Sequence, residues 1–98
     1  MREIVLSMQS GEPVASSRQI AENFEKRHDH VMRDIDAIKK DVPNFGEMFF
    51  ETTVPDSYGR EQRAYLMNRD GFTLLAMGFT GKAALEWKLK YIAAFNEM

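Results

Sequence analysis

Two helical patterns separated by a short connection constrain this chain more than any other feature. Residues 16–24 predict a short helix, because Ser16 or Ser17 can cap its first turn. Its apolar side chains share one face: Ile20, Ala21 and Phe24. Residues 27–41 predict a second helix, which Pro43 brings to an end. A short helix, a connection of three or four residues and a second helix that starts with basic and imidazole side chains are typical of a helix-turn-helix.

The second predicted helix has an apolar side and a polar side. Its apolar residues recur at spacings of four, three and four and therefore stack together: Val31, Ile35, Ile38 and Val42. The opposite side carries Asp29, Arg33, Asp36, Ala37 and Lys40, with His30 and Met32 at its edges. This polar side has the shape and the donors to face a DNA major groove. An ordinary solvated helix face also fits, because two of its residues are acidic.

Strand patterns lie on both sides of the helical pair. Residues 4–8 and 14–15 predict two short strands, with the break between them at Gly11-Glu12-Pro13. Residues 48–54 and 63–67 are rich in strand-forming residues and predict a β-hairpin. The turn-forming residues between these two strands make its tip polar and partly basic.

The last third of the chain predicts two more helices. Residues 68–78 form a short helix, and Thr80 can cap a longer one that continues to Met98. The apolar arc of the last helix covers about half its circumference: Ala84, Leu85, Trp87, Tyr91, Ile92, Ala94 and Phe95. Because one small core does not need so wide an arc, we expect a homodimer through this helix. A chain that stops in mid-helix is also expected of a domain cut from a longer protein.

The order of these elements predicts an α+β fold, namely a winged helix-turn-helix-like domain with a β-hairpin wing and two additional C-terminal helices. The length of 98 residues suits one core, so we expect a single domain over residues 1–98. The formal net charge of -2 disfavours DNA binding mildly, although charge on one face can override the total. The sequence has no cysteine and no apolar run near the roughly 20 residues of a membrane-spanning helix, which predicts a cytoplasmic protein without a membrane partner.

The candidate DNA-binding residues lie on the two helices and the hairpin. Lys26 and Arg27 stand at the start of the second helix, where they and the helix dipole favour phosphate. Arg60 and Arg63 of the hairpin are placed to contact a neighbouring phosphate or the minor groove. The complete set is Ser17, Arg18, Lys26, Arg27, His28, His30, Arg33, Lys40, Arg60 and Arg63.

Other chemistries find little support in the sequence. His28 and His30 are two residues apart on a helix, so they point to different sides and cannot share a metal ion without further ligands. There is no phosphate-binding glycine loop, no Ser/His/Asp arrangement and no pair of acids in an evident cleft. We therefore expect no enzymatic activity, no metal ion and no cofactor.

Three segments carry a resemblance to a known family. Residues 17–21 (SRQIA), 26–35 (KRHDHVMRDI) and 65–84 (YLMNRDGFTLLAMGFTGKAA) resemble the phage regulatory protein Rha family. The resemblance covers nearly the whole chain from Val14 onward, and its third segment is the most specific. Within that segment, Asp70-Gly71-Phe72 is a mark of the family to which no function is assigned.

The resemblance implies a transcriptional regulator of temperate phages and prophages that acts in the bacterial host cell. Such domains often precede a further, antirepressor-like region. The family commonly has Asn at the position of His30, and His cannot form the bidentate pair with adenine that Asn can. Two functions stay open. The chain is either a regulator that binds double-stranded DNA through its helix-turn-helix, or an antirepressor-type module that binds a repressor protein or a sister subunit.

Overall fold

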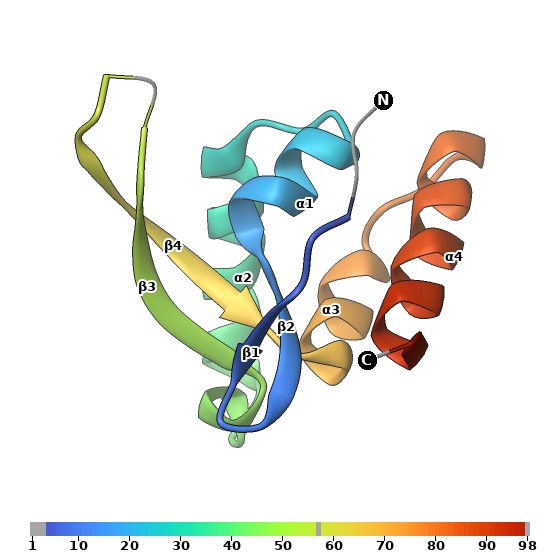
Figure 1. The fold of residues 1–98 in the computed structure, drawn as a ribbon, viewed down its shortest axis with the longest axis horizontal. Coiled ribbons are helices and arrows are strands. Elements are labelled where there is room, and N and C mark those ends of the chain that lie inside the picture. The colour runs from blue at the N-terminus through green and yellow to red at the C-terminus, as the bar shows by residue number, and fades with distance from the viewer. Residues whose placement is uncertain (1–3, 57, 98) are drawn as a thin grey trace.

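The computed structural model describes residues 4–56 and 58–97 and has an α+β architecture (Figure 1). A four-stranded antiparallel sheet is accompanied by four α-helices and one short 3-10 helix. In chain order the elements are β1 (Ser7–Gln9), β2 (Glu12–Ser16), α1 (Ser17–Asn23), α2 (His28–Asp41), η1 (Phe45–Glu47), β3 (Phe49–Pro55), β4 (Glu61–Met67), α3 (Arg69–Ala76) and α4 (Lys82–Glu97). Ser57 of the predicted hairpin tip and Met98 of the predicted last helix lie outside the described residues.

The sheet contains strands from both sides of the helical pair in the sequence. Its strand order is β1-β2-β4-β3, and β2 pairs with β4 through Ala15 opposite Met67 and Ser16 opposite Leu66. Strands β3 and β4 form the predicted hairpin, paired from Phe49 opposite Met67 to Pro55 opposite Glu61. Strand β2 leads directly into α1, so its pairing with β4 fixes where the helical pair begins.

The N-terminal hairpin differs from its prediction. The break predicted at Gly11-Glu12-Pro13 was wrong, because Pro13 lies within β2 opposite Met8 and the turn comes earlier. Gln9 faces Glu12, which leaves a two-residue turn of Ser10 and Gly11 with φ of 51° and 84°. Two successive residues in this left-handed region are what a tight hairpin turn requires, and Gly11 adopts it without steric cost.

The helices of the helical pair begin and end within one residue of their predicted bounds. Ser16 caps α1, and its hydroxyl oxygen accepts a hydrogen bond of 3.1 Å from the Gln19 backbone N–H. A four-residue connection then leads to α2, which starts at His28 and ends two residues before Pro43. The predicted apolar stripes are confirmed: Ile20, Ala21 and Phe24 of the first helix and Val31 and Ile35 of the second are buried, and Ile38 and Val42 pack at the edge of the core.

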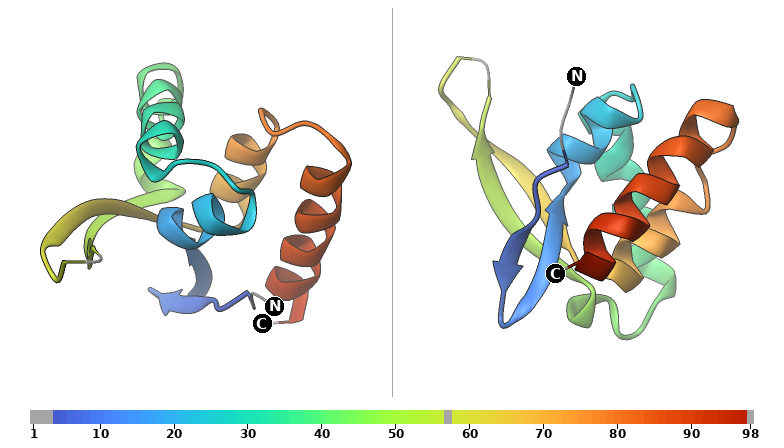
Figure 2. Two further views of the ribbon diagram at one scale, coloured as in Figure 1. Left: turned by 90° about the horizontal axis from the view of Figure 1, so that it is seen from above. Right: turned by 45° about the vertical axis from the view of Figure 1, so that its right-hand side comes forward.

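An aromatic cluster joins the helical pair to the C-terminal helices. The ring centroids of Phe24 and Phe79 are 4.8 Å apart, and those of Phe72 and Tyr91 are also 4.8 Å apart. Figure 2 shows how these elements are arranged. The β3–β4 hairpin extends on one side of the molecule, α4 lies on the opposite side, and α1 and α3 lie between them. No helix within the described residues has the length and apolar character needed to span a membrane.

Helix α4 begins later than predicted. Its first residue is Lys82, and the Gly81 carbonyl accepts the first backbone hydrogen bond from Leu85 N–H, so Gly81 holds the capping position that was expected for Thr80. Gly81 has a φ of 101°, which a glycine tolerates and a threonine would not. The helix is held to α1 by a buried hydrogen bond of 2.7 Å, in which Asn23 Nδ2 donates to the Tyr91 hydroxyl.

Replacing Tyr91 by Phe tests that bond. The substitution leaves the Asn23 amide buried with a lost partner, so we expect the free energy of unfolding to fall by about 1–3 kcal/mol in urea titrations. Tyr58→Phe is the matched control, because the Tyr58 side chain is exposed and its hydroxyl makes no hydrogen bond within the described residues. Equal stability of Tyr91→Phe and the parent chain would show that the buried bond contributes nothing net.

Gly71 offers a second test of the packing. A Cβ at this position would lie 2.7 Å from the Met48 carbonyl oxygen and 3.1 Å from Met67 Cβ, because the first turn of α3 lies directly against the sheet. Gly71→Ala should therefore destabilise the fold by about 1–3 kcal/mol despite the better helix propensity of alanine. Gly78→Ala is the control, since the added Cβ meets only an ordinary contact at 3.7 Å. A thermal melt in which both variants behave alike would contradict this account.

Candidate nucleic-acid interface

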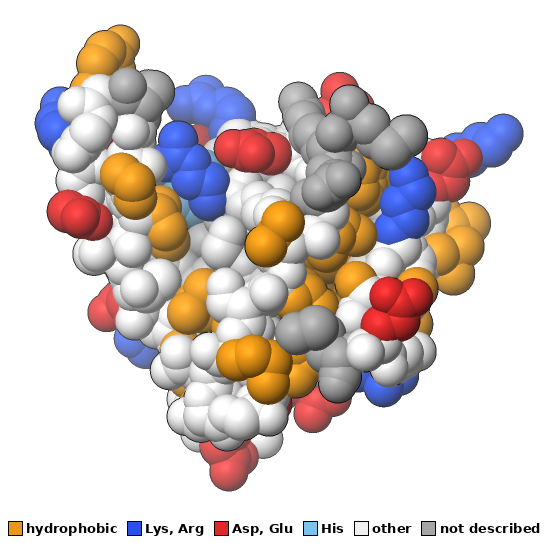
Figure 3. All heavy atoms as spheres, viewed as in Figure 1, with side chains coloured by type: hydrophobic (Ala, Val, Ile, Leu, Met, Phe, Trp, Pro, Cys, Tyr) orange, Lys and Arg blue, Asp and Glu red, His pale blue; other side chains and the backbone are white. Residues whose placement is uncertain are grey.

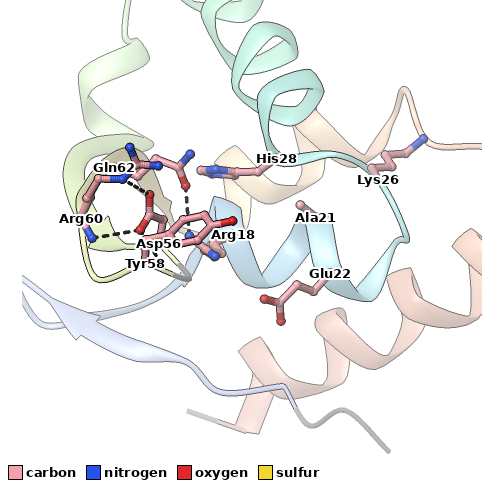
Figure 4. Close-up of a pocket in the computed structure, with 9 residues that line it drawn as sticks. All are labelled: Arg18, Ala21, Glu22, Lys26, His28, Asp56, Tyr58, Arg60 and Gln62. Atoms are coloured by element: carbon pink, nitrogen blue, oxygen red, sulfur yellow. Dashed lines mark hydrogen bonds and ion pairs between the residues drawn. The ribbon is translucent and has the colours of Figure 1, made fainter.

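Two open hollows lie where the β3–β4 hairpin meets the helical pair. The first, of about 370 Å³, lies between α1 and the hairpin tip (Figure 4) and is lined by Arg18, Ala21, Glu22, Lys26, His28, Asp56, Tyr58, Arg60 and Gln62. The second, of about 320 Å³, lies between α2 and β4 and is lined by His28, Asp29, Met32, Arg33, Asp36, Gln62 and Arg63. Because His28 and Gln62 line both, the hollows adjoin, and we call them together the hairpin–helix surface. In Figure 3 the hairpin is the lobe at the upper left, separated by a notch from the rest of the molecule.

Arg18 connects α1 to both strands of the hairpin. Its Nη1 donates to the Pro55 carbonyl oxygen at 3.2 Å and to Gln62 Oε1 at 3.0 Å. Both acceptors are neutral, and Arg18 forms no ion pair within the described residues, although its charge helps to lower the pKa of the nearby Asp56 carboxyl. Figure 4 shows Arg18 and Gln62 joined by this bond where they line the first hollow. Arg18 therefore holds a positive charge at a defined place between the helix and the hairpin.

Asp56 organises the hairpin tip. Its Oδ1 accepts hydrogen bonds from the backbone N–H groups of Tyr58 at 2.8 Å and Arg60 at 2.9 Å, and its Oδ2 pairs with Arg60 Nε at 3.2 Å. The backbone hydrogen bond from Arg60 is the main reason that the pKa of Asp56 is lowered. The Arg60 guanidinium lies 5.3 Å from the centroid of the Tyr58 ring, and Tyr58 is 82% exposed. The tip thus presents an aromatic and a cationic group outward.

Arg63 fastens the hairpin to α2. Its Nη2 lies 2.8 Å from Asp36 Oδ1, its Nε lies 2.7 Å from Glu51 Oε2, and it also donates to the Tyr65 hydroxyl at 2.9 Å. The bond from Arg63 lowers the pKa of Asp36, and the same two carboxylates raise the pKa of Arg63. Two carboxylates therefore already balance the charge of Arg63, which leaves it less available to a phosphate than the sequence indicated.

Ser17 lies behind the hairpin–helix surface and not on it. It is 0% exposed, its hydroxyl oxygen accepts the Tyr65 backbone N–H at 3.0 Å, and the same oxygen lies 2.9 Å from His28 Nε2. This enclosed position does not fit the sequence-based assignment of Ser17 as a DNA-contacting residue. His28 is half-buried and borders both hollows. Burial, followed by the nearby charge of Arg18, lowers the pKa of His28 and thereby favours its neutral ring.

The remaining candidates are spread along α2 and its approach. His30, Arg33 and Lys40 are exposed, and Arg33 has no ion pair within the described residues. Lys40 borders a separate hollow near Pro43 and Phe45, about 10 Å further along the helix axis from Arg33. Arg27 pairs with Asp29 at 3.2 Å.

Lys26 borders the first hollow at the end away from the hairpin. Its Nζ lies 4.8 Å from the centroid of the Phe79 ring, and Figure 4 shows its side chain pointing away from Arg18 and Arg60. The structure therefore brings Arg18, His28 and Arg60 together around one hollow and Arg33 and Arg63 around the next, with Lys26 and Lys40 towards the two ends.

Sequence reasoning missed three residues of this surface. Gln62 anchors Arg18, Asp56 shapes the tip, and Tyr58 is its exposed aromatic group. All three stand in or beside a turn-forming stretch, where polar residues are ordinary. Nothing in the pattern links them to Arg18, which is 44 positions from Gln62 in the chain.

Comparison with known proteins gives related chains but no related structure. An uncharacterised protein of Haemophilus influenzae is 43% identical over 88 residues, which cover 87% of this chain and 51% of that protein. A Bacillus subtilis protein named "SPbeta prophage-derived putative antirepressor protein YoqD" is 31% identical over 92% of this chain and 38% of its own length. A 22.8 kDa protein from the gp15-gp3 intergenic region of Salmonella phage P22 is 31% identical over 99% of this chain and 49% of its own. No solved structure matches.

This chain spans about half the length of two of these relatives and 38% of the third. A family model described as phage regulatory protein Rha matches residues 15–98. That match begins in β2 and takes in the helical pair, the hairpin and both C-terminal helices. The resemblance seen in the sequence is confirmed, and the chain belongs to the phage regulatory protein Rha family.

Proposed function

We propose that this chain is the DNA-binding part of a phage regulator that acts in the cytoplasm of the bacterial host. In this proposal α1 and α2 are a helix-turn-helix, the β3–β4 hairpin is a wing, and duplex DNA docks on the hairpin–helix surface. The observation that carries the proposal is the first hollow, where neutral acceptors fix Arg18 and where the Arg60 side chain, held by one contact to Asp56, stays 75% exposed. The proposal assigns no catalytic activity and no cofactor to the chain.

The geometry supports different roles for the two parts of the surface, phosphate contact in one and contact with base edges in the other. Arg18 and Arg60 both line a hollow open to solvent, which suits a phosphate of the DNA backbone. Helix α2 presents Arg33 and His30 on an exposed face whose opposite side is buried, which suits a helix lying in the major groove. Ala37 keeps the middle of that face short, so the helix can approach the base edges closely. We leave the buried Ser17 out of this interface.

The phosphate contacts are tested by the salt dependence of binding. The double variant Arg18→Gln/Arg60→Gln should bind DNA more weakly, and the slope of log K against log salt should become shallower by about 1.8, or about 0.9 for each lost phosphate contact. Fluorescence anisotropy with a labelled duplex, selected from a random library against the parent chain, measures both.

The matched control is Arg69→Gln, because Arg69 is exposed and lines neither hollow. Circular dichroism should show that the double variant still folds. A folded double variant with the parent salt slope would place the phosphate contacts elsewhere.

The polar face of α2 is tested by removing two of the helix's exposed cations, Arg33 and Lys40. Arg33→Ala together with Lys40→Ala should weaken binding to the selected duplex by roughly 1–3 kcal/mol and reduce the preference for it over random DNA. The control Arg69→Ala/Lys90→Ala removes the same charge from exposed positions on α3 and α4. Unchanged affinity in the Arg33/Lys40 variant would refute docking of α2 in the major groove.

A protein-binding role is the second candidate, and one observation favours it. Several charges at this surface are already paired within the chain: Arg27 with Asp29, Arg60 with Asp56, and Arg63 with Asp36 and Glu51. Together with the net charge of -2, this lowers the attraction for a polyanion. The Bacillus subtilis relative bears a name that refers to an antirepressor. In this alternative the partner is a phage or host repressor protein.

One pair of measurements distinguishes the DNA-binding function from the protein-binding function. An antirepressor-type module gives no DNA shift even at low salt and forms a stable complex with the cognate repressor in a pull-down. A DNA-binding regulator shifts duplex DNA at low salt without any added protein. Clear DNA binding and no retained repressor would rule out the second candidate.

A further inference from the structure

Helix α4 carries an apolar stripe that its own molecule leaves uncovered. Its inner side is part of the core, where Tyr91 and Phe95 are buried. Further round the helix, Leu85 is 56% exposed, Leu89 is 58% exposed and Ile92 is 39% exposed. These three follow one another at spacings of four and three, so they form one straight line along the helix. Figure 3 shows apolar side chains at the outer edge of the molecule on the side where Figure 1 places α4.

The stripe continues into a shallow groove between α3 and α4. The groove has a volume of about 150 Å³ and is lined by Phe72, Thr73, Ala76, Met77, Lys88 and Ile92. Met77 at its rim is 73% exposed. Lys88 does not project over the stripe, because its Nζ donates to the Phe79 carbonyl oxygen. Stripe and groove together form a continuous apolar surface of a kind that protein partners cover.

We propose that a second copy of this chain covers the stripe, with the two α4 helices antiparallel about a two-fold axis near Leu89. The spacing is nearly self-complementary under this symmetry: Leu89 of one copy meets Leu89 of the other, and Leu85 of each lies within one residue of the level of the other's Ile92. A helix of 16 residues is about 24 Å long, so the contact extends over several turns.

The charges at the two ends of α4 favour the antiparallel over the parallel arrangement of the two helices. Lys82 is the first residue of α4 and Glu97 the last described one, and both are exposed without an ion pair within the described residues. The antiparallel arrangement brings each Lys82 to within one residue of the level of the other copy's Glu97 and also opposes the helix dipoles. A parallel pair would place Lys82 beside Lys82 and Glu97 beside Glu97, and like charges across an interface oppose association.

Sedimentation velocity across a range of protein concentrations tests the dimer. The parent chain should shift from monomer to dimer as its concentration rises. Leu89→Glu should raise the dissociation constant about a hundredfold, because two carboxylates then meet near the axis. Ala83→Glu is the matched control, since Ala83 is exposed on the same helix but off the stripe. A parent chain that stays monomeric, or a Leu89→Glu variant that dimerises like the parent, would overturn the proposal.

Charge reversal tests the direction. Lys82→Glu and Glu97→Lys should each weaken the dimer, and the chain that carries both substitutions should recover the parent dissociation constant. A double variant weaker than either single one would contradict the antiparallel order.

Cross-linking gives an independent reading, because the chain has no cysteine of its own. Oxidation of a mixture of Leu85→Cys and Ile92→Cys chains should yield the mixed disulfide in preference to either homodimer. Preferred Leu85→Cys homodimers would indicate a parallel pair and overturn the antiparallel model. These readouts use no DNA, so their failure leaves the proposed DNA-binding role standing, and its failure leaves the dimer standing.

Discussion

The hydroxyl of Ser17 is the junction on which the arrangement of this molecule depends. It accepts the backbone N–H of Tyr65 in β4 and lies 2.9 Å from His28 at the start of α2, while Ser17 itself opens α1. Three elements are thus joined around one buried oxygen. Without that oxygen the buried Tyr65 N–H would have no acceptor from Ser17. An unpaired buried donor lowers the stability of the fold by more than one hydrogen bond at the surface contributes to it. The hairpin–helix surface exists because this junction holds the hairpin beside both helices.

Local patterns predicted most of the elements but not the way their polar side chains meet. The apolar stripes of α1 and α2 and the strand-forming runs of the hairpin repeat over a few residues, so they can be read directly. The position of the first turn could not, because Ser10 and Gly11 adopt left-handed conformations that the more conspicuous Pro13 obscured. Arg18 and Gln62 are 44 positions apart in the chain, and Arg63 and Asp36 are 27 positions apart. A periodic pattern of residues cannot predict contacts over such separations.

The family mark at Asp70-Gly71-Phe72 now has a structural reason. Gly71 N–H is bound by the Asn68 side chain, and a Cβ on Gly71 would strike the Met48 carbonyl, so α3 can approach the sheet only with glycine there. Phe72 then inserts among Phe24, Tyr91 and Phe95. This segment is therefore a packing device that ties the two C-terminal helices to the helical pair.

The pairing of β2 with β4 also has a consequence for how the chain folds. Ala15 meets Met67, so the strand that leads into α1 finds its place beside the hairpin only after residue 67 has been made. A fragment ending at Asp41 would contain α1 and α2 but neither Tyr65 nor Gln62, which hold Ser17 and Arg18 in position. We therefore expect such a fragment to lack the hairpin–helix surface, because that surface needs contacts between residues far apart in the chain.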